Sequence, residues 1–185
     1  MRASVFSLSL LGIAGTSIAQ NADAVVNSVY TIGNTTSLLN SDVQNFNGST
    51  VGIPWALQVQ VDAVNLYREL KAGTQAAQSS SNFGEPGSSR VSTALLNIVD
   101  LVKTALKNTA GKASTFADLR PLVLASLYQL KMQTDLFANA TIEKLAATEK
   151  SVAPTIKMDL DESFNDAIAA YGGKRKFRTH RRQGE

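Results

Sequence analysis

Apolar and small residues between Val25 and Phe46 recur at alternating intervals of four and three positions. On an α-helix this spacing forms one narrow stripe, whereas a strand would need alternation at every second residue. An isolated helix gains little from such a stripe, because most helical stability comes from packing against other elements. The pattern therefore predicts a helix over about 21–46 that needs partner helices. Its stripe consists of Val25, Val29, Ile32, Thr36, Leu39, Val43 and Phe46.

Two further segments present wider apolar surfaces. A second helix is predicted from Pro54 to about Ser79, since proline suits a first helical turn and no turn signal follows. Its two stripes predict a central helix contacted on two sides: Leu57, Val61 and Val64 on one, and Ala56, Val59, Ala63, Leu66 and Leu70 beside them. We interpret Trp55 as a core anchor or an entrance residue. A loop over 79–89 precedes a third helix over about 89–108, with a stripe at Val91, Leu95, Ile98, Val102 and Ala105.

The rest of the chain predicts two more helices. One is capped by Ser114 or Thr115 and runs to about Lys150, with a stripe at Val123, Leu127, Leu130, Thr134 and Phe137. The last begins at Ser151 or Pro154 and stops at Gly172, with an apolar face at Val152, Ile156, Leu160, Phe164, Ile168 and Tyr171. The predicted fold class is all-α, an antiparallel bundle of about five amphipathic helices over residues 20–173.

The start of the chain predicts export. Residues 1–19 have the features of a signal peptide: Arg2, a short apolar stretch over 5–14, and a small-x-small pattern that ends at Ala19. Three N-glycosylation sequons begin at Asn34, Asn47 and Asn139. Helical geometry places Asn34 and Asn139 away from the apolar stripes. We therefore expect a secreted, extracellular glycoprotein whose mature chain begins near Gln20.

Charge is distributed unevenly along the chain. Residues 174–185 contain six Lys or Arg and one Glu, whereas residues 20–173 contain eleven basic and fourteen acidic residues. A mildly acidic bundle argues against nucleic-acid binding. The basic tail is too charged to fold alone. It has three interpretations: a flexible solubilising tail, a contact with an anionic surface, or a pair of dibasic processing sites. It does not encode a GPI anchor, and no segment predicts a transmembrane helix.

Catalytic chemistry has few candidates in this sequence. There is no cysteine, and the only histidine is His180 in the tail, which removes most nucleophilic triads and metal sites. Asp159 and Glu162 can share a helix face, but a solvated acidic helix start explains them better than paired-carboxylate catalysis. No glycine-rich phosphate loop is present. We predict a non-enzyme that needs no cofactor and no metal.

The order of these features resembles a known family. The marks are the Val-x-x-x-Val-x-x-Ile helix ending in 43–48 (VQNFNG), then Leu119-Arg120-Pro121, and the closing segment 164–171 (FNDAIAAY). Over about 21–173 the chain is similar to the fungal hydrophobic-surface-binding proteins, also called cell-wall galactomannoproteins. The resemblance implies a secreted, glycosylated helical protein that adsorbs to hydrophobic surfaces, sits in or near the cell wall, and in some members holds fatty acids inside the bundle. Some members carry a Ser/Thr-rich C-terminal region suited to wall attachment, whereas residues 174–185 of this chain are basic.

We consider two functions, of which the excess apolar surface of the helices favours the first. The first is binding of hydrophobic surfaces, or of a long-chain fatty acid or similar lipid in a cavity between helices. The second is a structural or recruiting cell-wall protein with a fully packed bundle, whose outer surface contacts cell-wall polysaccharide or secreted hydrolases. A monomer is expected in either case. Thr36 and Thr134 could bond a lipid head group or their own helix backbone. The candidate lipid-binding residues are Val29, Ile32, Thr36, Leu39, Leu57, Val61, Val64, Leu95, Ile98, Val102, Leu127, Leu130 and Thr134.

Overall fold

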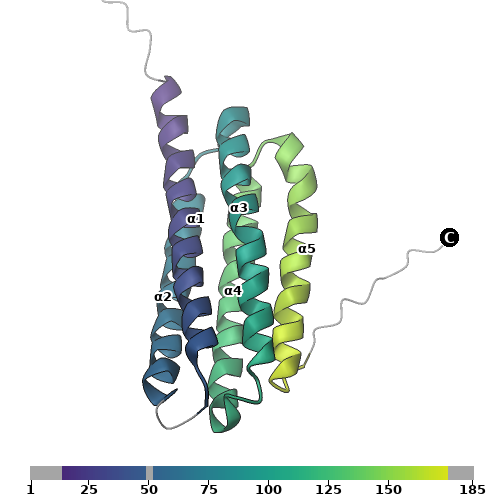
Figure 1. Cartoon of the computed structure of the whole chain (residues 1–185). Coiled ribbons are helices and arrows are strands. Elements are labelled where there is room, and N and C mark those ends of the chain that lie inside the picture. The colour runs from purple at the N-terminus through teal and green to yellow at the C-terminus, as the bar shows by residue number, and fades with distance from the viewer. Residues whose placement is uncertain (1–13, 49–51, 175–185) are drawn as a thin grey trace, which may run out of the picture.

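A computed structural model describes residues 14–48 and 52–174 of the chain, with side chains described from Ala22 onward. Five α-helices make up almost all of these ranges, and no strand occurs within them. They are α1 (Ala14–Asn45), α2 (Ile53–Ser79), α3 (Gly84–Gly111), α4 (Arg120–Lys144) and α5 (Ala147–Ala170), and a short 3-10 helix, η2 (Ala117–Leu119), precedes α4. The predicted all-α antiparallel bundle is confirmed (Figure 1).

The predicted ends of the chain are only partly described. Helix α1 begins at Ala14, earlier than the predicted start near residue 21, and so continues into the predicted signal peptide. Residues 1–13 of that segment lie outside the described residues, as does the basic tail from Arg175 on. The signal peptide 1–19, the domain 20–173 and the tail 174–185 therefore stay predictions.

The helices form a closed ring rather than a layered stack. Helix α1 packs against α2 and α3, α2 packs against α4, α3 against α5, and α4 against α5. In Figure 1, α1 and α3 lie in front, α2 and α4 lie behind them, and α5 stands at the right edge. The site described below lies in the interior of this ring.

The stripe of the first helix faces the interior, as predicted. Val25, Val29 and Val43 are at most 1% exposed. At the end of α1, Phe46 stacks on Phe116 with ring centroids 4.4 Å apart. Partly buried residues, Leu39 among them, pack against the same core. Periodicity alone located this wall of the bundle correctly.

The loop predicted over 79–89 is shorter than expected, because α3 begins at Gly84. Pro86 lies in the first turn of α3, where a backbone N–H has no helical partner to lose. Glu85 in the same turn complements the helix dipole. Ser88 is fully buried and accepts a hydrogen bond from the backbone N of Ala146 at 2.8 Å. Tertiary contacts thus make helical a segment whose composition is typical of a loop.

The boundary predicted between the last two helices near Ser151 is wrong. Helix α4 ends at Lys144, and α5 begins at Ala147 with Pro154 inside it. Besides the bond from Ala146 to Ser88, the backbone N of Phe83 donates to the carbonyl of Lys144 at 3.0 Å. The chain therefore turns where another loop binds it, and no local stop signal in the sequence marks the position.

The beginning of the fourth helix also differs from the prediction. Residues after Gly111 form turns and the 3-10 helix η2, and α4 begins only at Arg120 instead of near Ser114. Pro121 occupies its first turn, the early position predicted for it.

One face of α2 was assigned incorrectly. Leu57, Val61 and Val64 are 65%, 50% and 38% exposed, so the helix is not covered on both of its apolar stripes. The adjacent stripe, which includes Val59 and Leu66, faces the core. Trp55 is 41% exposed and is therefore not a core anchor.

Candidate lipid cavity

The interior of the ring holds a cavity of about 510 Å³ to which all five helices contribute. It extends along α4 from Val123 to Thr141, which corresponds to about 27 Å of helix. Its lining is predominantly apolar. Representative lining residues from the five helices are Ile32, Val59, Leu95, Leu130, Ile142 and Leu160. An elongated apolar space of this kind suits a hydrocarbon chain.

Most of the predicted site residues line this cavity. Nine do so: Ile32, Thr36, Leu39, Leu95, Ile98, Val102, Leu127, Leu130 and Thr134. Val29 is fully buried in the core but does not line the cavity. Leu57, Val61 and Val64 lie on the exposed side of α2 and do not line the cavity.

Sequence reasoning named no site residue of α2 or α5 that lines the cavity, and it also missed lining residues of other helices, such as Leu106 of α3 and Phe137 of α4. On α2 the apolar lining residues belong to the second stripe, which the periodicity showed but which was not assigned to the site. On α5 most of them belong to the predicted apolar face. Examples are Val59, Ala63, Leu66 and Leu70 of α2, and Val152, Ile156, Leu160 and Phe164 of α5. Choosing between two adjacent stripes needs knowledge of the neighbouring helices.

Several polar groups at the cavity wall already have protein partners. Thr36 Oγ1 donates to the carbonyl of Ile32 at 2.7 Å, and Thr109 Oγ1 to that of Ala105 at 2.8 Å. Ser126 Oγ donates to Gln60 Oε1 at 3.2 Å. The hydroxyl of Thr36 therefore satisfies its own helix backbone, the second of the two roles considered for it.

The end of the cavity beside the α4–α5 connection is different. Thr141 is 1% exposed, and its Oγ1 has no hydrogen-bond partner among the described residues. Glu149 Oε2 is also buried and lacks a partner there. Thr141 lies in the last turn of α4 and Glu149 in the first turn of α5, and both line the cavity. This end therefore combines apolar walls with unsatisfied oxygen atoms.

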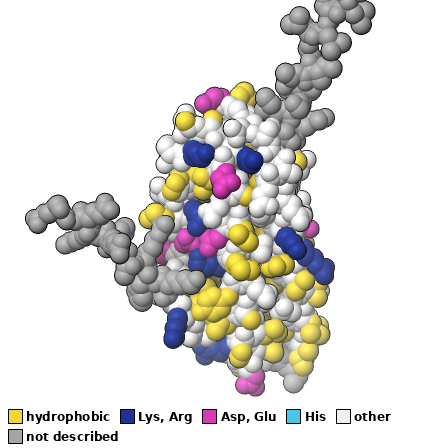
Figure 2. Space-filling view, turned by 180° about the vertical axis from the view of Figure 1, so that it is seen from behind, with side chains coloured by type: hydrophobic (Ala, Val, Ile, Leu, Met, Phe, Trp, Pro, Cys, Tyr) yellow, Lys and Arg dark blue, Asp and Glu magenta, His cyan; other side chains and the backbone are white. Residues whose placement is uncertain are grey.

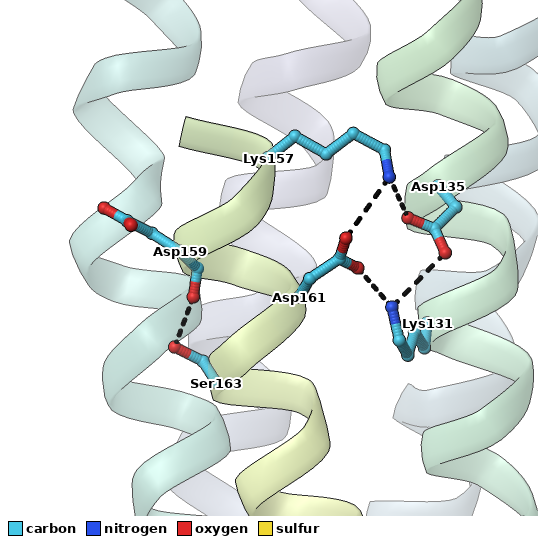
Figure 3. Close-up of polar contacts among 6 residues, drawn as sticks. All are labelled: Lys131, Asp135, Lys157, Asp159, Asp161 and Ser163. Atoms are coloured by element: carbon cyan, nitrogen blue, oxygen red, sulfur yellow. Dashed lines mark hydrogen bonds and ion pairs between the residues drawn. The ribbon is translucent and has the colours of Figure 1, made fainter. Parts of the chain in front are cut away.

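A cluster of four charges joins α4 to α5 (Figure 3). Lys157 Nζ lies 2.7 Å from Asp135 and 3.3 Å from Asp161, and Lys131 Nζ lies 3.3 Å from Asp135 and also pairs with Asp161. Partial burial works against the charge of Asp161, but Lys131 and Lys157 outweigh it and hold its pKa below the usual range. Lys157 lines the cavity, but its ammonium group is already paired with two carboxylates of the protein, Asp135 and Asp161.

The carboxylate pair considered from the sequence lies on an exposed helix face. Asp159 and Glu162 are both exposed on α5, as a solvated helix face would be. In Figure 3, the side chain of Asp159 points away from the charge cluster, and its backbone oxygen accepts a hydrogen bond from Ser163. Across the described ranges, no group of three or more acidic, histidine or cysteine side chains is placed to hold a metal ion.

A different carboxylate pair, which sequence reasoning missed, lies between α1 and α2. Asp62 is 5% exposed and accepts a hydrogen bond from Gln58 at 3.0 Å. Burial raises the pKa of Asp42 to about 6, and the hydrogen bond to Asp62 and its charge act in the same direction. Neither aspartate lines the cavity. Two positions on separate helices are not visibly paired in a sequence.

The sequons lie on the outside of the bundle. Asn34, Asn47 and Asn139 are all exposed, and none of them lines the cavity. A glycan at each position would extend into solvent without displacing core residues. None of the helices, over the part of the chain that is described, is long and apolar enough to cross a membrane.

Comparison with known proteins gives a family and a fold. A model of the family described as hydrophobic surface binding protein A matches residues 22–143. A search of curated proteins finds no match.

Three solved structures share the fold. The crystal structure of AFMP4P in complex with palmitic acid is similar with a TM-score of 0.77 and 26% identity, over 81% of this chain and 99% of that one. Ligand binding domain 1 of the Penicillium marneffei MP1 protein, complexed with arachidonic acids, has a TM-score of 0.75 and 13% identity over 82% and 98% of the two chains. Domain 2 of the same protein has a TM-score of 0.69 and 13% identity over 89% and 99%.

Proposed function

We propose that this chain, which belongs to the hydrophobic surface binding protein A family, holds a long-chain fatty acid or similar lipid between its helices without catalysing a reaction. The apolar cavity of about 510 Å³ carries this proposal. Its volume falls inside the range of about 300–1,000 Å³ typical of ligand pockets. Burial of a hydrocarbon chain contributes about 0.8 kcal/mol per CH₂, so a long chain contributes on the order of 10 kcal/mol before binding costs.

Two observations support this choice. The neighbour at 26% identity is in complex with palmitic acid, a ligand of the proposed class. The alternative, a structural or recruiting wall protein, assumed a bundle packed to ordinary interior density, and a cavity of this size does not fit that assumption. A role in meeting cell-wall polysaccharide or secreted hydrolases has no comparable support.

Adsorption to hydrophobic surfaces has its own candidate region, which we call the outer apolar face. Monomeric proteins seldom expose large contiguous apolar areas without a purpose. In Figure 2, yellow side chains gather in the lower half of the side formed by α2 and α4. We assign to this face the exposed residues Ile53, Leu57, Val61 and Val64 in the first half of α2 and Leu122 near the start of α4.

The setting of this function would be extracellular. A signal peptide over residues 1–19 would export the chain, and the exposed Asn34, Asn47 and Asn139 would carry glycans, close to the cell wall. Mass spectrometry of the secreted protein tests this setting. We expect an N-terminus at Gln20 and glycan mass on the three asparagines. Retention of residues 1–19 together with unmodified asparagines would contradict it.

The cavity proposal is tested by filling the cavity. Ala153 lines it from α5, so Ala153→Phe should reduce saturable binding of palmitic acid to delipidated protein at least tenfold. Ala72→Phe, at an exposed position of α2, is the matched control and should bind as the natural chain does. Equal affinities for both variants, with both folded by circular dichroism, would place the lipid elsewhere.

The outer apolar face is tested separately. Replacing Leu57 and Val61 together by glutamine should lower the amount adsorbed on hydrophobic beads several-fold while palmitic acid still binds. Leu38, 61% exposed on α1, gives the control Leu38→Gln. A loss of adsorption as large in the control would show that the assigned face has no special role.

A further inference from the structure

The two unsatisfied oxygen atoms at the α4–α5 end of the cavity indicate where a polar head group belongs. Buried polar atoms without a hydrogen-bond partner are rare in folded proteins, because each one loses its bonds to water. Thr141 Oγ1 and Glu149 Oε2 are both in this condition among the described residues, and both groups line the cavity. Thr36 and Thr109, further down the cavity, already donate to their own helices. The α4–α5 end therefore lacks a bonding partner that a ligand can supply.

The chemistry of these two groups restricts that partner. An ionised carboxylate only accepts hydrogen bonds, whereas a threonine hydroxyl both donates and accepts. Glu149 lies in the first turn of α5, where the helix dipole favours its negative charge. A head group at this end must therefore donate a hydrogen bond to Glu149. A second carboxylate has no proton to donate and would place a like charge beside the first in an apolar space.

Among the described residues, most of the cations nearest in the fold to this end are engaged elsewhere. On α5, Lys150 Nζ bonds the backbone oxygen of Glu143, and Lys157 belongs to the four-charge cluster. On α3, Arg90 pairs with Asp23. The remaining charged residues near this end are Lys144 of α4 and Glu85 and Glu143, and within the described ranges none of them forms an ion pair with Glu149.

We propose that the α4–α5 end of the cavity selects lipids whose head group is neutral and donates a hydrogen bond. Fatty alcohols, monoacylglycerols and fatty acids in their protonated form have this chemistry, and ionised fatty acids do not. Thr141 donates to the head-group oxygen and Glu149 accepts from its O–H. The inference rests on the proposed lipid-binding function and specifies its ligand class. It predicts that fatty-acid binding depends on pH and that fatty-alcohol binding does not.

The test compares dodecanol with dodecanoic acid on the delipidated full chain at pH 5 and pH 8, by calorimetry. The alcohol should keep its affinity within twofold between the two pH values, and the acid should bind at least tenfold more weakly at pH 8. The alcohol also controls for any change of the protein itself with pH. Equal affinity of alcohol and acid at pH 8 would overturn the inference, and would point to capture of the carboxylate by backbone N–H groups of the first turn of α5.

Variants assign the effect to the two side chains. Glu149→Gln should raise the affinity for dodecanoic acid at pH 8 at least fivefold, whereas Glu143→Gln, which removes an exposed charge nearby, should leave it unchanged. Equal effects of the two variants would overturn the assignment to Glu149. Thr141→Val should weaken both ligands several-fold at both pH values. Because Thr141 also completes the sequon of Asn139, the matched control is Asn139→Gln, which removes the same sequon at an exposed position and should leave both affinities unchanged. Thermal unfolding checks that each variant is folded. If neither lipid binds saturably at either pH, the proposed function itself fails.

Discussion

Helix α1 and the first half of α5 both border the cavity, but they are held in the bundle in different ways. Val25, Val29 and Val43 of α1 are almost completely buried. On α5, the buried residues Phe164, Ala167 and Ile168 all lie in its second half. In the first half, Val152 is 58% exposed although it lines the cavity.

The contacts around the two segments explain this difference. Helix α1 packs against both α2 and α3 through its buried stripe. Helix α5 also packs against two helices, α3 and α4, but its first half contains no buried residue, and polar contacts hold it in addition. These are the bond from Ala146 to Ser88 and the cluster of Lys131, Asp135, Lys157 and Asp161. Regions with few buried apolar contacts open most easily. We infer that the α1 side supplies most of the stability of the bundle, and that the first half of α5 adapts its position to the bound lipid.

The largest loss of stability is expected when a buried side chain on the α1 side is truncated. Phe46 is 4% exposed and stacks on Phe116, so Phe46→Ala should lower the free energy of unfolding by about 3–5 kcal/mol, through lost burial and a residual cavity. Chemical denaturation measures the change. Leu38→Ala, on the exposed side of α1, should cost less than about 0.5 kcal/mol. Similar values for both variants would remove the distinction between the two sides.

A smaller effect is expected where polar contacts hold α5. Lys157→Met removes one cation from the cluster and leaves Asp135 and Asp161 to share Lys131, which should cost about 1–2 kcal/mol because the groups are partly buried. Burial opposes the charge of Lys157, but the two carboxylates outweigh it and raise its pKa. Lys107→Met, at an exposed position of α3, is the control for charge removal. A cost for Lys157→Met that does not fall at high salt would contradict an electrostatic origin.

The α1 side also contains a carboxylate pair, Asp42 and Asp62, that is expected to lower stability. The pKa of Asp42 is raised from 3.8 to about 6, so the folded chain binds more protons than the unfolded chain between these values. This pair therefore lowers stability as pH rises from about 4 to 6. Because Asp42 is only partly buried, the effect should be about 1 kcal/mol or less. Asp42→Asn should flatten this part of the stability profile measured by denaturation at several pH values. An unchanged slope would show that the pair does not titrate in this way.

Sequence periodicity predicted the parts of the fold that depend on local spacing. The stripe of α1 and the number of helices follow from where apolar residues fall along one helix. The start of α3 and the break at Leu145–Ala146 do not, because Ser88, Phe83 and Lys144 fix them through contacts between distant segments. Leu57 and Leu66 are equally apolar, so the positions of the neighbouring helices α1 and α4 decide which of them faces inward.

The sequence predicted that the bundle holds an apolar site, but it did not predict which individual polar atoms line it. Nine of the proposed residues line it because helix stripes point to a common interior. Thr141 and Glu149 gave no signal, since an unsatisfied oxygen can be recognised only when all of its neighbours are placed. The family resemblance also supplied no residue at this end.

The smallest change in stability is expected on the adaptable side, at Val152. Because this side chain is 58% exposed, Val152→Ala should alter the free energy of unfolding by no more than about 0.5 kcal/mol. The same side chain lines the cavity, and loss of its two methyl groups should weaken lipid binding about threefold. Calorimetric titration with dodecanol and denaturation of the same preparation measure both quantities. A large loss of stability with unchanged affinity would show that the first half of α5 is part of the rigid core. The bound lipid would then be contacted mainly by the other helices.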